Sequence, residues 1–547
     1  MAELSFFLLQ LGLLVTKGFL CLVLHGHLPF VRHPEVPELL EEDWFFEAVT
    51  EVYLPLLDVL MRLQADGVNF KVALSLSPTL TAMLQDSLLV SRYRVHLENL
   101  IRLAESECRR TAGSADFAPL AQMYRERFLR CRRLWVNEFH GDLIDLFRAL
   151  RQSGQVEFLT TAATHGYLPL MEVCPSSIKA QVEIGCRSFE RIFGSRPAGF
   201  WMPECGYTPL VGQILAEAGI RYTFLETHGI LHAAPSPKFG VYAPIRSPSG
   251  LALFGRDPET AHQVWSRAEG YPGDEWYRDF YRDIGFDLEE KYIKPFLYHG
   301  GLRLSTGMKY FRITGRADAK EPYNPARARE RIEEHARDFL FSRQRQAEHL
   351  HGVMGQPPVV VAMYDAELFG HWWFEGPAWI ENVFRKFAAL STGTGQSGPE
   401  VQLTTPSEVL ERLPRMQKAT PHLSSWGWKG YNEVWLQGAN AWIYRHLHQA
   451  AWRMRQLVAS HPKASGITRR ALNQALRELF LAQASDWAFI LAEGTASEYA
   501  KKRFNRHVDR FTQLYEQIQN SRLDESWLTV IEKQDNLFPF IDYTIYG

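Results

Sequence analysis

Four short motifs in this 547-residue chain gather histidines, carboxylates or aromatic side chains. They are His25–Pro29, Gly199–Tyr207, Met363–Gly376 and Ser424–Trp435. The carboxylates Glu204 and Asp365 each follow a short apolar run. A pair of carboxyl groups can break a glycosidic bond, because one protonates the leaving oxygen while the other attacks the sugar carbon or activates water. The motifs therefore indicate glycosidic bond chemistry.

The aromatic content is high, with 15 Trp, 21 Tyr and 34 Phe, or 13% of all residues. Most of these rings are expected in the core. The loop Ser424–Trp435 is different, since it carries three tryptophans among glycines and is poorly suited to core packing. Flat rings offer apolar faces on which sugar rings stack. The tryptophans beside the motifs therefore predict a groove for a sugar chain.

Seven short apolar runs predict buried parallel strands, separated by long amphipathic stretches that predict helices. The runs are Phe19–His25, Phe70–Ser75, Val156–Thr161, Ala198–Trp201, Tyr222–Leu225, Val359–Tyr364 and Val401–Thr404. This alternation is typical of a β/α barrel or a doubly wound sheet. Polar residues follow most of the runs, which favours a barrel, because barrel enzymes place their active sites at the carboxyl ends of strands.

Two regions depart from the alternation. Residues 88–150 show long charged helical patterns, which predict a helical insertion in a barrel of residues 15–414. Residues 415–547 show only helical patterns and predict an α-helical C-terminal domain. The apolar run near the start lacks preceding Lys or Arg and is too short to cross a bilayer, which takes about 20 residues. We expect residues 1–14 to be an upstream extension from a mis-assigned start codon, outside both domains.

The composition argues against several classes of function. Lys and Arg number 60 against 62 Asp and Glu, so the chain carries no excess positive charge for nucleic acid. Six scattered cysteines form no CxxC pair, which argues against a zinc ribbon or a disulfide framework. We therefore expect reduced thiols, a cytoplasmic location, no membrane partner and no metal or other cofactor.

The motifs, in their order, resemble signature regions of glycoside hydrolase family 57, and within it the 1,4-α-glucan branching enzymes. The similar segments are HGHLP at His25, THGYLPL at Thr164, FWMPECGY at Phe200, YDAELFGHWWFEG at Tyr364, SSWGWKGYNEVW at Ser424 and AQASDW at Ala482. The match runs from about Lys17 to the C-terminus. The resemblance implies an incomplete (β/α)7 TIM-like barrel with a helical insertion and an α-helical C-terminal domain. It also implies transfer of α-1,4-glucan chains, from amylose or glycogen, to a 6-hydroxyl in glycogen biosynthesis.

The same resemblance implies roles for individual residues. Glu204 corresponds to the nucleophile of a retaining double displacement, and Asp365 to the proton donor and base. Four further positions match substrate contacts, namely Arg256, Gly273, Trp426 and Asp486. Five more are expected to line the cleft, namely His25, His27, His165, Trp265 and Trp435.

Two departures from the family pattern bear on the balance between transfer to a glucan and transfer to water. After Tyr207 the chain passes directly into Thr208–Val211, where several relatives carry a longer insertion. The segment Thr227–Phe239 contains no Tyr, whereas some branching enzymes carry one at the tip of this loop. A 4-α-glucanotransferase and an α-amylase therefore remain alternatives. The residues also leave open a metal-dependent hydrolase using His25, His27 and Asp365, and a non-catalytic glucan-binding protein.

Overall fold

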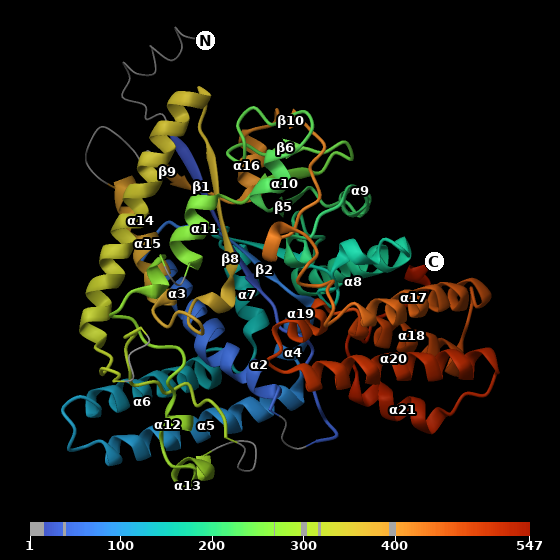
Figure 1. The fold of residues 1–547 in the computed structure, drawn as a ribbon, viewed down its shortest axis with the longest axis horizontal. Helices are drawn as coiled ribbons and strands as arrows, with labels where there is room; N and C mark the ends of the chain where they lie inside the picture. Colours follow the sequence, from blue (N-terminus) through green and yellow to red (C-terminus); the bar gives the residue numbers. More distant parts are fainter. Residues whose placement is uncertain (1–15, 37–39, 267–268, 297–302, 316–318, 393–400) are drawn as a thin grey trace.

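The computed structural model describes residues 16–36, 40–266, 269–296, 303–315, 319–392 and 401–547. The predicted N-terminal extension, residues 1–14, lies outside these ranges. A parallel sheet occupies the centre, helices cover it, and a group of C-terminal helices (orange to red) packs to one side (Figure 1). Within the described ranges, no helix is long and apolar enough to cross a membrane.

One sheet is built around β1, which is buried along its whole length, as expected of an apolar run in a parallel sheet. The strand order is β4-β3-β2-β1-β8, with every pair parallel, and β9 also pairs with β1. The strands are β1 (Gly18–Gly26), β2 (Val72–Leu76), β3 (Val156–Thr161), β4 (Phe200–Trp201), β8 (Val359–Asp365) and β9 (Val401–Leu403).

A second sheet has the order β10-β6-β7-β5, in which β5 and β7 are parallel. Its strands are β5 (Tyr222–Leu225), β6 (Ile245–Arg246), β7 (Ala252–Gly255) and β10 (Gln417–Lys418). A parallel bridge between Gly199 and Tyr222 joins β4 to β5. At the other side, the Asp257 N–H donates to the Val361 carbonyl of β8 over 3.0 Å. The strands β1, β2, β3, β4, β5, β7 and β8 thus form an incomplete (β/α)7 barrel, which confirms the predicted fold class.

The strand predictions differ from this ring at two points. The run Val401–Thr404 forms β9, which pairs with the first residues of β1 and lies off the main strand path. The ring instead includes β7, Ala252–Gly255, which the search for apolar runs missed. Its apolar run, Leu251–Phe254, is as long as the predicted run Tyr222–Leu225, so the signal was present in the sequence.

Helices separate the strands, and several begin at side-chain caps, such as Asn324 before α14 and Thr405 before α16. The helices α5 and α6 pack on each other, whereas α7 packs against β3. The helical segments before α17 are α2 (Glu42–Ala48), the π-helical turn η1 (Val49–Tyr53), α3 (Leu54–Ala65), α4 (Pro78–Leu84), α5 (Ser87–Arg110), α6 (Ala118–Arg132), the π-helical turn η2 (Arg133–Glu138), α7 (Leu143–Gln152), α8 (Pro175–Phe193), α9 (Pro209–Glu217), α10 (Thr227–Leu231), α11 (Pro258–Trp265), α12 (Ile284–Asp287), α13 (Glu290–Ile293), α14 (Pro325–Met354), α15 (Gly376–Thr392) and α16 (Pro406–Arg412).

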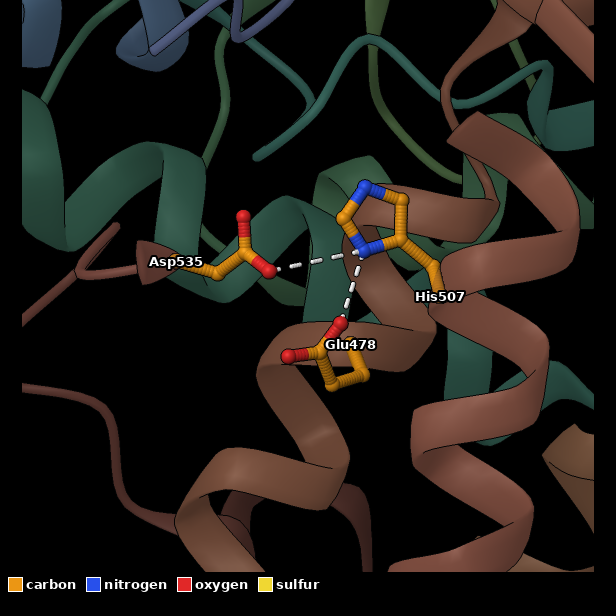
Figure 2. A group of neighbouring side chains, drawn as sticks. All are labelled: Glu478, His507 and Asp535. Atoms are coloured by element: carbon orange, nitrogen blue, oxygen red, sulfur yellow. Dashed lines mark hydrogen bonds and ion pairs between the residues drawn. The ribbon is translucent and has the colours of Figure 1, made fainter. Parts of the chain in front are cut away.

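The C-terminal helices are held together by a buried ionic cluster (Figure 2). His507 Nδ1 lies 2.7 Å from Glu478 Oε2 and 3.9 Å from Asp535 Oδ2, and Arg510 pairs with the same Asp535 oxygen. Burial lowers the pKa of His507 well below its ordinary value, so the ring takes part as a neutral group beside the Arg510–Asp535 ion pair, and the cluster links α18, α20 and the end of α21. The helices are α17 (Trp442–Ser460), α18 (Gly466–Ala482), α19 (Ser485–Glu493), α20 (Ser497–Gln519) and α21 (Glu525–Gln534).

The start of α19 connects these helices to the barrel. The Ser485 N–H donates to the His165 carbonyl over 3.2 Å, and Gly166 forms a β-bridge with Ala484. His165 follows the carboxyl end of β3. The barrel and the C-terminal helices therefore meet where chemistry concentrates in barrel folds.

Candidate active site

A cavity of about 740 Å³ opens at the carboxyl ends of the strands. Its wall contains ten of the eleven residues predicted from the sequence, namely His25, His27, His165, Glu204, Arg256, Trp265, Asp365, Trp426, Trp435 and Asp486. Gly273 is the exception, although its neighbour Pro272 lines the cavity. The barrel supplies both proposed catalytic carboxyl groups, whereas Trp426, Trp435 and Asp486 come from the predicted C-terminal domain.

Glu204 occupies a strained turn directly after β4. Its backbone φ is 59° and that of Cys205 is 51°, both in the left-handed region that residues other than glycine rarely adopt. Such a conformation costs about 1–3 kcal/mol per residue and persists only where the surroundings enforce it. Here the Trp426 N–H donates to the Glu204 carbonyl over 3.0 Å. The strained turn places the Glu204 side chain in the cavity wall.

Two donors orient the Glu204 carboxylate. Trp426 Nε1 donates to Oε2 over 2.8 Å, and Ser485 Oγ donates to Oε1 over 3.2 Å. Burial raises the pKa of Glu204, while the hydrogen bond from Trp426 lowers it. Hydrogen bonds to the charged form favour that form. The arrangement therefore suits an ionised, fixed carboxylate, which a nucleophile requires.

Replacing Trp426 by Phe is expected to lower kcat about 10–100-fold. The ring face remains, but a hydrogen bond to a charged group, worth about 1.5–3 kcal/mol, is lost. Because that bond lowers the pKa of Glu204, the acidic limb of the pH–rate profile should move to higher pH. The measurement is kcat against pH on amylose. The matched control is Trp442→Phe, since Trp442 Nε1 donates to the Ala439 carbonyl outside the cavity wall. An unchanged acidic limb in Trp426→Phe would contradict the assignment.

Asp365 ends β8 and has an environment that favours its neutral form. Burial raises the pKa of Asp365 well above its ordinary range, and the charges of Glu367 and Glu204 raise it further. Arg256 opposes this shift, but its guanidinium is already engaged, since Nη1 donates to Glu226 Oε2 over 3.0 Å. A carboxyl that keeps its proton near neutral pH can act as a general acid.

The rings of three histidines, His25, His27 and His165, stack on one another in the cavity wall. His25 Nε2 lies 3.0 Å from His165 Nε2, and the rings of His27 and His165 stack at 3.9 Å. Burial lowers the pKa of both His25 and His165 well below the ordinary value, so these rings are neutral. His27 Nε2 lies 3.2 Å from each carboxylate oxygen of Asp486.

The His25 ring is already engaged with other groups of the protein. His25 Nδ1 lies 3.1 Å from Ser75 Oγ, and the His25 ring stacks on Trp201 at 4.7 Å. Among the described residues, the one group with metal-ligand geometry is the Glu478, His507 and Asp535 cluster. His25, His27 and Asp365 do not converge in that way, so the structure gives the metal-dependent hydrolase alternative no support.

Exposed aromatic rings surround the mouth of the cavity. Trp265 is 49% exposed, Trp372 54% and Trp428 70%, which is unusual for such large apolar groups unless a partner covers them. The Trp372 ring stacks on Phe280 at 4.5 Å. Trp435, in contrast, is buried and stacks on Tyr167 at 4.4 Å. The exposed rings are available for stacking on a sugar chain.

Several cavity residues were missed by the sequence reasoning. Glu367 accepts hydrogen bonds from Tyr53 Oη and from the His27 N–H. Its signal was its place two residues after Asp365 in the same motif. Tyr53 lies in an amphipathic helical stretch that gave no sign of function. The other missed lining residues include Arg278, Phe280, Tyr281 and Phe489.

The segment that lacks a Tyr begins with the short helix α10. His228 Nε2 lies 2.8 Å from the Gly430 carbonyl, so this ring packs on the Ser424–Trp435 loop. His228 does not contribute to the cavity wall. The large polar residue of this segment therefore supports the tryptophan loop from outside the cavity.

Two solved structures, one of a branching enzyme and one of an α-amylase, resemble this chain over nearly its whole length. The GH57-type branching enzyme from Pyrococcus horikoshii is 32% identical with a TM-score of 0.86, and the alignment covers 97% of each chain. The α-amylase AmyC from Thermotoga maritima is 41% identical with a TM-score of 0.89, covering 97% of this chain and 99% of that one.

The sequence comparisons agree with the structural ones. The 1,4-alpha-glucan branching enzyme TK1436 of Thermococcus kodakarensis is 33% identical over 95% of this chain and 77% of that protein. Residues 446–546 match the family profile described as 1,4-alpha-glucan branching enzyme, C-terminal. Residues 21–420 match the profile of Glycosyl hydrolase family 57. The chain is therefore a member of glycosyl hydrolase family 57.

Proposed function

We propose that this protein is a 1,4-α-glucan branching enzyme, which cleaves an α-1,4-glucan and transfers the released chain to a 6-hydroxyl of an acceptor. The observation that carries the proposal is the pair of carboxyl groups with different partners in one aromatic-lined cavity. Burial raises the pKa of both groups, but the donors Trp426 and Ser485 limit the rise for Glu204, whereas neighbouring charges add to it for Asp365. Such a divergence separates a nucleophile from an acid.

The reaction follows as a retaining double displacement. Glu204 attacks the anomeric carbon while Asp365 protonates the departing glycosidic oxygen, so that a glucosyl ester forms on Glu204. Asp365, now a carboxylate, then removes the proton from an acceptor 6-hydroxyl. That oxygen attacks the anomeric carbon, displaces Glu204 and completes an α-1,6 linkage.

The remaining predicted residues act in binding. Arg256 lies 5.6 Å from the Trp426 ring centroid, between the tryptophan loop and Asp365. Asp486, held by His27, offers carboxylate oxygens to sugar hydroxyls. Trp265 supplies an exposed ring face, whereas the buried Trp435 shapes the cavity wall. Gly273 is assigned to the same binding region through its neighbour Pro272, which lines the cavity.

Transfer to a glucan requires that water be kept from the glucosyl ester. The tryptophan loop and α19 are suited to this task, since Trp426, Trp428 and Phe489 lie in the cavity wall beside the barrel residues. We propose that the predicted C-terminal domain, residues 415–547, closes one side of the site. The predicted barrel of residues 15–414, with its 88–150 insertion, carries the catalytic pair.

An α-amylase is the second candidate, and two observations favour it. AmyC, described as an α-amylase, is 41% identical to this chain. The Thr227–Phe239 segment also lacks the Tyr that some branching enzymes carry, and its His228 does not line the cavity. In an α-amylase the same Glu204 and Asp365 would act, with water as the acceptor.

Incubation with amylose separates these candidates. Branching produces α-1,6 linkages without a matching rise in reducing ends, whereas hydrolysis produces one reducing end for each bond cleaved. A 4-α-glucanotransferase redistributes chain lengths without either change. A protein that only binds glucan leaves the chains intact.

The proposed role in the cell is glycogen biosynthesis in the cytoplasm, with amylose-like chains or glycogen as the partner. Support for a reducing compartment comes from the six cysteines, all of which are free thiols.

A further inference from the structure

The loop that follows Asp365 is fixed at two points by the π-helical turn η1. Tyr53 Oη donates to Glu367 Oε1, and Glu51 Oε2 lies 2.6 Å from His371 Nδ1. The fit is close, because a Cβ at Gly370 would lie 1.9 Å from the Glu51 carbonyl oxygen. Gly370 also has a φ of 116°, which strongly favours glycine. Single π-helical turns are frequent at functional sites.

Glu367 has the partners of an ionised carboxyl group. Its Oε1 accepts from Tyr53 and, over 3.2 Å, from the backbone N–H of His27. Burial raises the pKa of the Tyr53 hydroxyl well above its ordinary value, so Tyr53 keeps its proton and acts as the donor. Burial also raises the pKa of Glu367, while the bonds from Tyr53 and His27 oppose that shift.

Glu367 lies in a short 3-10 turn, Ala366–Leu368, that begins directly after Asp365, and both carboxyl groups line the same cavity. Asp365 faces two other charged groups from separate elements, Glu204 after β4 and Arg256 after β7. A neighbouring negative charge disfavours ionisation of a carboxyl group, so an ionised Glu367 favours a protonated Asp365.

We propose that Glu367 is a third functional carboxylate, a positioning residue whose charge, fixed by Tyr53 and the His27 backbone, governs the proton on Asp365. The inference rests on the proposed function in one respect, namely that Asp365 is the proton donor. Glu204 loses its charge when the glucosyl ester forms, and its contribution to the raised pKa of Asp365 is then lost. Glu367 keeps its charge through both steps, as Arg256 does, and therefore contributes a constant negative charge near Asp365.

The test is the pH dependence of kcat/KM for total cleavage of α-1,4 bonds, since its alkaline limb reports the acid of the free enzyme. In Glu367→Gln the alkaline limb should move to lower pH by about one unit, because a neighbouring negative charge is removed. Glu367→Asp keeps the charge and should leave the limb in place. Tyr53→Phe should shift the limb in the same direction but less, because Glu367 then loses only one donor.

The matched control is Tyr93→Phe. The Tyr93 hydroxyl is also buried and bonds to the same π-helical turn, at Thr50 Oγ1 over 3.1 Å, but it does not line the cavity. Its alkaline limb should remain at the wild-type position. An unshifted limb in Glu367→Gln, or a loss of activity that is uniform across pH, would overturn the proposal.

A second readout needs no turnover. The infrared band of the protonated Asp365 carboxyl, obtained as the difference between wild type and Asp365→Asn, should titrate at lower pH when Glu367 is Gln. An unchanged titration would refute the inference even if branching is confirmed. Conversely, a wild-type protein that makes no α-1,6 linkages refutes the proposed function, while the band still decides the role of Glu367. If Glu367→Gln does not fold, Tyr53→Phe carries the same test, because it deletes a single hydroxyl.

Discussion

Replacing Glu204 by Gln is expected to lower kcat by about 10⁴-fold or more, as removal of a covalent nucleophile does in other enzymes. The amide has the same shape but cannot form the glucosyl ester. The amide oxygen can accept from Trp426 Nε1 and the amide NH2 can donate to Ser485 Oγ, so the strained turn should persist. The free energy of unfolding should change little, because the burial of a charge is removed along with its hydrogen-bonding advantage. The measurements are cleavage of amylose and urea-induced unfolding.

The matched control is Glu183→Gln on the outer helix α8. Glu183 pairs with Arg187 and Arg196 and does not line the cavity, so its replacement should leave turnover within about twofold. If Glu204→Gln still formed α-1,6 linkages at a comparable rate, Glu204 would not be the nucleophile.

Replacing Asp365 by Asn is expected to lower turnover on amylose by about 10²–10⁴-fold, the usual contribution of a general acid. In the wild type, Asp365 must be protonated for the first step, so activity is lost as the pH rises through its raised pKa. Glu204 must be ionised, so activity is also lost as the pH falls through the pKa of Glu204. The variant should lose the alkaline limb and keep the acidic one. A full alkaline limb in Asp365→Asn would assign the acid to another group.

The positions of Glu204 and Asp365, the proposed catalytic pair, in the cavity wall could be predicted from the sequence because each follows an apolar run that ends at the carboxyl edge of the sheet. That rule depends only on strand order and direction, which the hydrophobic pattern encodes. The left-handed turn at Glu204 could not be predicted, because it depends on a tertiary hydrogen bond from Trp426, more than two hundred residues later.

The third carboxylate illustrates a different limit. Glu367 lies in the Met363–Gly376 motif, but its proposed role depends on Tyr53. Tyr53 belongs to a π-helical turn within an otherwise regular amphipathic stretch. The hydrophobic periodicity of a sequence does not reveal a π-helical turn inside a helical stretch. The strand β7 was also missed, although the equally short β5 was predicted and Arg256, directly after β7, was expected to be a contact residue.

The tryptophans divide according to depth in the structure. Trp435 was predicted to line the cleft and does so, yet it is buried and stacked on Tyr167. Trp265, Trp372 and Trp428 line the same cavity with about half or more of each ring exposed. Sequence identifies the residues but not which of them are covered, because coverage is decided where the barrel meets the C-terminal helices.

The central claim is that a glycosyl chain becomes covalently attached to Glu204 during the reaction, and mass spectrometry of Asp365→Asn tests this most directly. An α-maltosyl fluoride donor needs no protonation of its leaving group, so the first step proceeds while the second, which needs Asp365 as base, is slowed. A short incubation followed by acid quench and proteolysis should show a peptide containing Glu204 with the mass of one added maltosyl group. No such peptide should appear in the Glu204→Gln protein. Attachment at another residue, or release of product with no adduct at any time, would contradict the account.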